Sequence, residues 1–249
     1  MGSLEGKVAI VTGGGTGIGK GIARAFAEQG CNLVLAARNL DRLESAADEL
    51  RKIPGAGKIV VSAVDVTKEQ DVIDLFALTI REFNKLDILV NNSGSFDGGP
   101  IEKLTLEQWE RVMGVNVTGP FLCTREAFKI MRPAGGGRII NIGSIAAQRP
   151  REQSIPYSTS KNAVWGLTTA AALEGRPFGI AVSCLHPGNV AVERRADGRS
   201  ATGRDMGPEP LVSTADMGRT ALLMATLPPE TNMLEAIVLP VAQTYLGRG

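Results

Sequence analysis

Tyr157 and Lys161 form the pair of residues in this sequence best suited to proton transfer. They lie in the segment 156–173, whose pattern predicts a helix, and residues four apart project from the same face of a helix. An ammonium beside a phenol favours the ionised phenolate, so such a pair can act as acid or base nearer neutral pH than tyrosine alone. The same spacing arises by chance in exposed helices, so the pair gains meaning only from the motifs around it.

A run of glycines follows the first apolar segment of the chain. Residues 7–11 predict a strand, residues 12–19 are Thr-Gly-Gly-Gly-Thr-Gly-Ile-Gly, and apolar residues then recur at helical spacing up to Gly30. At such a junction, unpaired backbone N–H groups and the helix dipole attract a pyrophosphate, and glycine lets the backbone approach it. Glycines also serve plain tight turns, but this position favours a dinucleotide site.

The residues after the second and third predicted strands bear on the choice of dinucleotide. Dinucleotide folds place after the second strand either an acid, which binds the ribose 2′-hydroxyl, or a base for the 2′-phosphate of NADP. Here Arg38 and Asn39 follow the strand without an acid, and Arg38 can pair with a phosphate, although a solvated arginine would look the same. Asp65 is placed to accept from an adenine amino group or to cap the next helix. NADP(H) is favoured over NAD(H).

Strand and helix patterns alternate along the whole chain, and these elements must position the motifs. Strands are predicted at 7–11, 33–36, 59–64, 86–90, 138–142, 180–185 and 236–239, and helices after the glycine turn and at 41–50, 67–83, 105–116, 119–131, 156–173 and 214–224. Thr67 and Gln70 predict a capping box for the third helix. Several strands are solid apolar runs, typical of parallel strands buried on both faces. We therefore predict one α/β domain over residues 1–249, a Rossmann-like doubly wound parallel sheet of about seven strands with helices on both faces.

Further motifs stand in a fixed order between the glycine turn and the C-terminal third. They are Asn91-Asn92-Ser93-Gly94 after the fourth predicted strand, Asn116, Ser144 after the fifth strand, and Pro187-Gly188 after the sixth. Together with the glycine turn and the tyrosine–lysine pair, this set resembles the short-chain dehydrogenase/reductase family in its single-domain branch. The resemblance is strong over residues 4–192 and weak beyond.

The resemblance implies hydride transfer between a nicotinamide cofactor and a carbonyl or alcohol carbon. Tyr157 would donate a proton to the carbonyl oxygen or remove it in the reverse direction, and Ser144 would hydrogen-bond that oxygen. Lys161 would also hold the nicotinamide ribose, and Asn116 would position a water linking Lys161 to solvent. From the residues alone, Ser144 also fits a turn cap and Asn116 a kinked helix. The cofactor would be held by Gly13, Gly15, Thr16, Gly17, Ile18, Gly19, Arg38, Asn39, Asp65, Val66, Asn92, Gly94, Tyr157, Lys161, Pro187, Gly188 and Val190.

Two segments depart from the family pattern. The family commonly has a threonine after the Pro-Gly motif that bonds the nicotinamide carboxamide, where this chain has Val192. Carboxamide binding would then rest on backbone such as that of Val190. The family also often has Asp-Gly-Gly after its last strand, whereas this chain continues differently over residues 239–249. That tail often packs on partner subunits, so a homodimer or homotetramer is implied with its geometry open.

Residues 191–211 are expected to form a substrate lid. The segment is rich in arginine, glycine and proline without periodicity, and connections of that length are usually functional lids or disordered. Its arginines suit an anionic substrate or a solvated charge run. We expect the residues after Ser144, residues 96–99 and residues 148–155 to line the substrate pocket. His186, the single histidine, is expected to be structural.

Charge and cysteine usage exclude several classes of protein. Lys+Arg 27 and Asp+Glu 26 give a net charge of +1, so no basic field attracts nucleic acid or anionic lipid. Three separated cysteines form neither a disulfide framework nor a metal site, and they indicate a reducing compartment. No apolar run is long enough to span a bilayer. We expect a cytoplasmic protein with a small carbonyl or alcohol substrate and without nucleic-acid, membrane or metal partners.

Two other functions stay open. An enoyl reductase would deliver hydride to a C=C bond, but family members with that activity often lack the serine, so Ser144 argues against it. A non-catalytic NADP(H)-sensing scaffold would use the nucleotide only to bias a partner interaction. The complete set of Tyr157, Lys161, Ser144 and Asn116 argues against that scaffold.

Overall fold

The computed structural model describes residues 2–193 and 209–245 of the 249-residue chain. Its centre is a sheet of seven parallel strands in the order β3-β2-β1-β4-β5-β6-β7. The strands are β1 (Val8–Thr12), β2 (Asn32–Ala37), β3 (Ile59–Ala63), β4 (Ile88–Asn91), β5 (Gly137–Ile142), β6 (Ile180–Pro187) and β7 (Glu235–Val238). The predicted strands are therefore all present, each within two residues of its predicted bounds.

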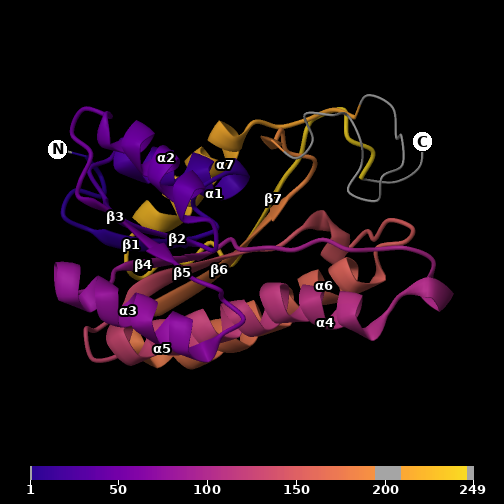
Figure 1. Ribbon diagram of the computed structural model, residues 1–249. Helices are drawn as coiled ribbons and strands as arrows, with labels where there is room; N and C mark the ends of the chain where they lie inside the picture. The colour runs from indigo at the N-terminus through magenta and orange to yellow at the C-terminus, as the bar shows by residue number, and fades with distance from the viewer. Residues whose placement is uncertain (1, 194–208, 246–249) are drawn as a thin grey trace.

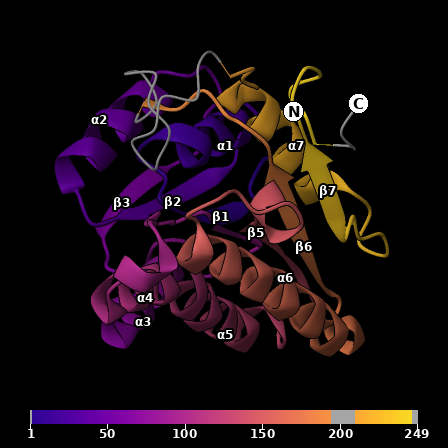
Figure 2. The same ribbon diagram turned by 90° about the vertical axis from the view of Figure 1, so that its right-hand side faces the viewer.

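Helices cover both faces of the sheet (Figures 1 and 2). One layer contains α1 (Gly17–Ala27), α2 (Leu40–Arg51) and α7 (Thr214–Thr226). The opposite layer contains α3 (Glu69–Phe83), α4 (Leu106–Met113), α5 (Gly119–Met131) and α6 (Ile155–Gly175). Short helical turns are η1 (Ile101–Lys103), η2 (Gly114–Thr118), η3 (Ile145–Ala147) and η4 (Arg176–Phe178). This confirms the doubly wound Rossmann-like fold.

Each face of the sheet has its own apolar core, because successive residues of a strand point to opposite sides. In β1, Ala9 and Val11 belong to the core shared with α1, α2 and α7, whereas Ile10 belongs to the core under α3, α5 and α6. All five residues of β1 are buried. A central parallel strand therefore needs a continuous apolar run, which is the pattern the sequence has there.

The start of α3 differs from the prediction. The hydroxyl and backbone N–H of Thr67 donate to Oδ1 of Asp65 at 2.8 and 3.0 Å, and Lys68 occupies the N-cap position. The Gln70 side chain donates to Asp74 instead of turning back to the helix start. The predicted capping box of Thr67 and Gln70 is therefore wrong, because Asp65 supplies a nearer acceptor for the threonine.

The predicted break between the helices at 105–116 and 119–131 is also different. A capping box of Thr105 and Gln108 opens α4. The chain then passes through the π-helical turn η2 directly into α5, so α4, η2 and α5 form one continuous helical run. A π-turn holds an extra residue, and such turns are frequent at functional sites.

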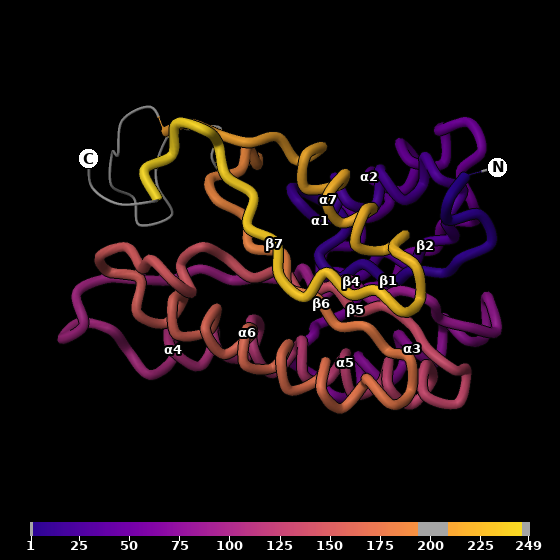
Figure 3. Tube along the Cα trace, turned by 180° about the vertical axis from the view of Figure 1, so that it is seen from behind, coloured from indigo at the N-terminus to yellow at the C-terminus, as the bar shows by residue number. Residues whose placement is uncertain are grey.

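The C-terminal part of the described chain lies beside the loop that follows β6. Figure 3 shows β7 at the edge of the sheet next to β6. Beyond it, Oε1 of Gln243 accepts from the backbone N–H of Asn189 at 2.9 Å, and the Tyr245 hydroxyl donates to Oε1 of Gln148. The tail thus fastens two loops at the carboxyl end of the sheet.

The three thiols lie inside the protein. Cys31, Cys123 and Cys184 are buried, and burial raises the pKa of each to about 12, so they are poor nucleophiles. In the described ranges, no group of three or more histidine, cysteine, aspartate or glutamate side chains could hold a metal ion. No helix within those ranges has both the length and the apolar character needed to cross a membrane.

Candidate active site

The predicted cofactor residues gather at the carboxyl ends of the strands. Gly13, Gly15, Thr16, Gly17, Ile18 and Gly19 follow β1, Arg38 and Asn39 follow β2, Asp65 and Val66 follow β3, Asn92 and Gly94 follow β4, Pro187 ends β6, and Gly188 and Val190 follow it. The sheet order reverses between β1 and β4. Open α/β sheets bind ligands at this switch point, outside the carboxyl ends of the strands.

The glycine turn is fastened to the end of β4. Asn92 donates from Nδ2 to the backbone oxygens of Thr12 and Gly13 at 2.9 and 3.2 Å. The buried Thr12 hydroxyl accepts from the backbone N–H of Asn92 at 3.0 Å. Gly13 has φ +65°, which favours glycine, and a Cβ on Gly19 would lie 2.3 Å from the Gly13 oxygen. Both glycines are therefore required by this close-packed turn.

The start of α1 already holds an anion in this structure. The backbone N–H of Gly17, the first residue of the helix, donates to Oε2 of Glu193 at 2.9 Å. Thr16 is the N-cap residue and makes no side-chain capping bond. The carboxylate stands where a nucleotide fold places phosphate oxygens, so the turn suits the pyrophosphate of a dinucleotide. Sequence reasoning missed Glu193, which lies 176 residues from its partner.

The ends of β2 and β3 bring Arg38 close to Asp65. Arg38 is exposed. Burial disfavours ionisation of Asp65, but hydrogen bonds from Thr67 and the charge of Arg38 outweigh it and lower the Asp65 pKa. Asn39 caps α2, because its Oδ1 accepts from the backbone N–H of Arg42 at 2.9 Å. The exposed Arg38 therefore lies at the end of β2, where the sequence predicts the 2′-phosphate of NADP.

Lys161 connects Tyr157 to the end of β5. Both residues are on α6, and the Lys161 ammonium lies 5.7 Å from the centroid of the Tyr157 ring. Nζ of the buried Lys161 also donates to the backbone oxygen of Ile142 at 2.7 Å, which leaves two of its three hydrogens for other acceptors. The half-buried Tyr157 ring packs against Phe96 with centroids 5.0 Å apart. The predicted pair is therefore side by side.

Ser144 lies two residues beyond Ile142, at the start of η3. Its Oγ accepts from the backbone N–H of Ala146 at 3.1 Å, so the serine does cap a turn, as its residue type allows. A hydroxyl has two acceptor lone pairs and one donor hydrogen. The bond from Ala146 uses a lone pair, and the hydroxyl hydrogen is left to donate to an oxygen.

Asn116 sits in the π-turn η2 and is almost fully buried. Its Nδ2 donates to the Ser95 oxygen and to Oγ of Ser160, both at 2.9 Å, and its Oδ1 accepts from the Ser95 N–H at 2.7 Å. Sequence reasoning gave no role to Ser95, which directly follows the Asn91–Gly94 motif, or to Ser160, which lies between Tyr157 and Lys161. The Asn116 side chain thus joins the loop after β4 to α6. A bound water would donate to the second lone pair of Asn116 Oδ1 or to the Asn116 backbone oxygen.

The loop after β6 is tied to the loop that precedes α6. Val190 pairs with Val212 in an isolated bridge. Arg151, in the loop before α6, donates to Oδ1 of Asn189 at 2.9 Å and forms an ion pair with Glu209 at 2.8 Å. The central part of the predicted lid, which includes Arg194, Arg195, Arg199 and Arg204, lies outside the described residues.

The family model for short chain dehydrogenases matches residues 7–202. The chain belongs to this family. As a short-chain dehydrogenase/reductase, it is an oxidoreductase with the fold that binds a nicotinamide cofactor. A relative from Aspergillus oryzae, the short chain dehydrogenase/reductase astE, is 36% identical over 230 residues, which cover 92% of this chain and 85% of that protein.

Solved structures match this chain over nearly its whole length. The 3-ketoacyl-(acyl-carrier-protein) reductase from Brucella melitensis, complexed with NADH, is 29% identical with a TM-score of 0.83, covering 96% of this chain and 98% of that one. A metagenomic short-chain oxidoreductase in complex with NADP is 30% identical with a TM-score of 0.83, covering 97% and 100%. Relatives therefore include complexes with both dinucleotides, and the choice between them depends on residues of each chain.

Proposed function

We propose that this short-chain dehydrogenase/reductase transfers a hydride between NADP(H) and the carbonyl carbon of a ketone or aldehyde, or the matching alcohol. The observation that carries the proposal is the contact of Lys161 with both the Tyr157 ring and the Ile142 oxygen. This contact brings Tyr157, the proposed proton donor, to the end of β5. Ser144 lies two residues beyond that end. The nicotinamide supplies the hydride when it is bound.

The side chains would act together on the substrate oxygen. Tyr157 gives its hydroxyl proton to that oxygen in reduction and takes it back in oxidation. Ser144 donates its free hydroxyl hydrogen to the same oxygen and stabilises the negative charge that develops there. Lys161 places its ammonium beside the Tyr157 ring and holds the ribose of the cofactor, and Asn116 keeps the π-turn against α6.

A screen of carbonyl compounds tests the activity. We would follow NADPH oxidation at 340 nm with small ketones, aldehydes, a β-keto thioester and an α,β-unsaturated ketone. We expect reduction of at least one C=O group, and product analysis should show that the C=C bond of the unsaturated ketone is intact. Reduction of the C=C bond would instead establish an enoyl reductase. Cofactor binding without any turnover would favour the sensing scaffold.

Arg38→Ala is expected to weaken NADPH binding about 10- to 100-fold and to change NADH binding less than about twofold, because only NADPH carries the 2′-phosphate. Isothermal titration calorimetry with both dinucleotides measures this. Lys52→Ala, which removes a charge at the opposite end of α2, is the control and should affect neither. Equal losses for both dinucleotides in Arg38→Ala would remove Arg38 as the reader of the phosphate.

Glu193→Gln is expected to strengthen binding of both dinucleotides by about two- to tenfold. The Glu193 carboxylate uses the Gly17 N–H in this structure and would also repel a pyrophosphate that takes its place. The measurement is the same titration, repeated at high salt, where the gain should shrink. Glu28→Gln, at the far end of α1, is the matched control. Weaker binding in Glu193→Gln would mean that the carboxylate supports the cofactor.

We further propose a single catalytic domain with a lid at 191–211 and a homo-oligomeric state in the cytoplasm. Large apolar side chains are exposed on the α4–α5 side, with Leu106 70% and Phe121 47% exposed, which supports a contact between subunits. Light scattering after size-exclusion chromatography should give a mass two or four times 26.2 kDa. A monomer in that measurement would remove the oligomer from the proposal.

A further inference from the structure

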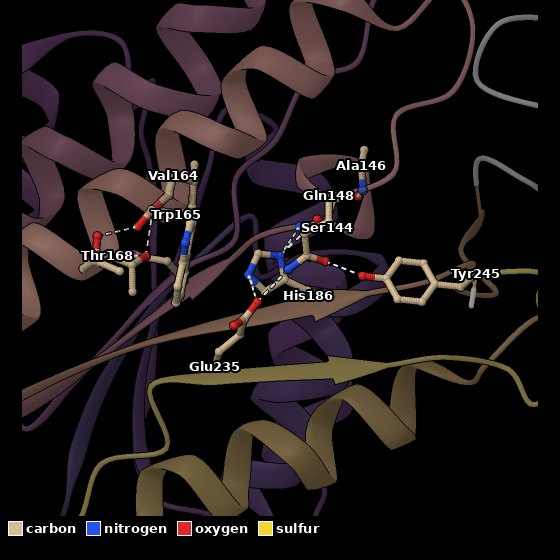
Figure 4. Close-up of polar contacts among 11 residues, drawn as sticks. Ser144, Ala146, Gln148, Val164, Trp165, Thr168, His186, Glu235 and Tyr245 are labelled. Atoms are coloured by element: carbon tan, nitrogen blue, oxygen red, sulfur yellow. Dashed lines mark hydrogen bonds and ion pairs between the residues drawn. The ribbon is translucent and has the colours of Figure 1, made fainter. Parts of the chain in front are cut away.

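His186 lies directly behind Ser144. The imidazole is fully buried near the end of β6, between η3 and the edge strand β7 (Figure 4). Its Nδ1 is 3.0 Å from the backbone oxygen of Ser144 and 3.3 Å from the backbone nitrogen. A single Nδ1 either donates to that oxygen or accepts from that N–H, so one hydrogen bond links the ring to the backbone of the residue whose hydroxyl we place at the substrate oxygen.

The other side of the ring faces Glu235. Nε2 of His186 is 3.5 Å from Oε1 of Glu235 on β7, and the same carboxylate oxygen accepts from Nε2 of Gln148 at 2.7 Å (Figure 4). Nε2 is buried and has no hydrogen-bond partner within normal distance among the described residues. A buried imidazole nitrogen is costly when unpaired, and the Glu235 carboxylate is the acceptor that faces Nε2 in the tautomer whose hydrogen is on Nε2 and whose Nδ1 accepts from the Ser144 N–H.

The neighbouring residues leave the ring little freedom. A Cβ on Gly143 would lie 2.6 Å from Nδ1, so only glycine at that position lets the ring reach the backbone of Ser144. On the other side, the Trp165 ring from α6 meets the imidazole edge-on with centroids 5.8 Å apart. The ring is therefore packed in one orientation, which suits a group that must hold another residue still.

The charges around the imidazole come from two elements. Burial lowers the pKa of His186, the backbone of Ser144 and the carboxylate of Glu235 act to raise it, and the Lys161 ammonium on α6 acts to lower it. The His186 pKa is therefore sensitive to the carboxylate on β7 and to the ammonium on α6. Glu235 is the negatively charged group among those that act on the His186 pKa.

We propose that His186 is a positioning residue for the carbonyl reaction, which holds the backbone of Ser144 so that the serine hydroxyl points at the substrate oxygen, and that Glu235 fixes the imidazole. The proposal rests on the function proposed for Ser144 above. It assigns a role to the edge strand β7, which contributes no residue to the cofactor motifs. It also explains why a polar ring stands between Leu185 and Pro187 in this buried strand.

A double-mutant cycle with a carbonyl substrate found in the screen tests this role. His186→Leu should lower kcat about 10- to 100-fold with little change in KM or in the dissociation constant of the cofactor. His186→Asn keeps a polar atom near the position of Nδ1 and should recover most of that loss. In a Ser144→Ala background, His186→Leu should reduce the residual rate by less than about twofold, because the group that it positions is gone.

The outcomes separate this inference from the function on which it rests. A full rate in Ser144→Ala would overturn the role of Ser144 and the inference with it. A large loss in Ser144→Ala together with a normal rate in His186→Leu would overturn the inference alone. An equal fold-loss from His186→Leu in both backgrounds would show that the histidine acts independently of the serine, and would also overturn it.

A second measurement does not depend on turnover or on the leucine variant folding. His186 is the only histidine in the chain, so the imidazole signals in a ¹⁵N NMR spectrum belong to one ring. Glu235→Gln should move the titration of that ring to lower pH, because it removes a carboxylate that raises the His186 pKa. Glu230→Gln changes an exposed glutamate that does not act on the His186 pKa, and it is the control. An identical titration in wild type and Glu235→Gln would overturn the role of Glu235.

Discussion

Replacing Tyr157 with phenylalanine is expected to abolish nearly all turnover, with a fall in kcat of about 10²- to 10⁴-fold. The substitution removes only the hydroxyl that would carry the proton and keeps the ring that packs on Phe96. Binding of NADPH should stay within about threefold of wild type, since the other predicted cofactor contacts are unaltered. Steady-state kinetics and calorimetry on the same preparation give both numbers.

The chain offers a matched control for this change. It has two tyrosines, and Tyr245→Phe removes the same atom from the C-terminal tail, where the hydroxyl bonds Gln148. We expect its effect on kcat to be at least tenfold smaller than that of Tyr157→Phe. If Tyr157→Phe kept wild-type turnover, the proton would have to come from another group, and the assignment of the tyrosine–lysine pair would be wrong.

Gly19→Ala is expected to destabilise the protein by about 1–3 kcal/mol and to weaken binding of either dinucleotide at least about tenfold. The new Cβ would lie 2.3 Å from the Gly13 oxygen and 2.4 Å from Nδ2 of Asn92. It therefore displaces the backbone of the turn and the side chain that fastens it to β4. Thermal unfolding and calorimetric titration measure the two effects separately.

Gly166→Ala is the control for that substitution. Gly166 is an exposed helical glycine of α6, and a Cβ there meets nothing within 4 Å. Alanine has the higher helix propensity, so this variant should be as stable as wild type or more stable by up to about 1 kcal/mol. A Gly19→Ala protein with wild-type stability and wild-type cofactor affinity would show that the turn does not need its close contact.

The fold could be predicted because its signals are local and repeated. A buried parallel strand such as β2 contains a solid apolar run, and its predicted start at Leu33 differs from the observed start at Asn32 by one residue. The capping box predicted for Thr67 and Gln70 was wrong because the prediction did not consider a second acceptor for the threonine hydroxyl. Asp65, two residues earlier, takes the threonine hydroxyl, and only the three-dimensional turn decides between the two acceptors.

The site could be predicted where residues stand at strand ends, and not where they meet across the fold. In a parallel sheet all carboxyl ends face the same edge, so motifs that follow successive strands must gather there. The contact of Glu193 with Gly17 joins residues 176 positions apart and has no pattern in the sequence. Its nearness to the turn depends on how the loop after β6 leaves the sheet.

The position of β1 between β2 and β4 bears on how the chain is synthesised. The hydrogen bond that fastens the turn after β1 joins Thr12 to Asn92, which is synthesised 80 residues later. At about 5–20 residues per second on a ribosome, the apolar edge of β1 stays without its second neighbour for roughly 4–16 seconds. During that time it is open to pairing with other chains. A dinucleotide cannot protect the nascent protein then, because its binding turn is fastened only once Asn92 has emerged.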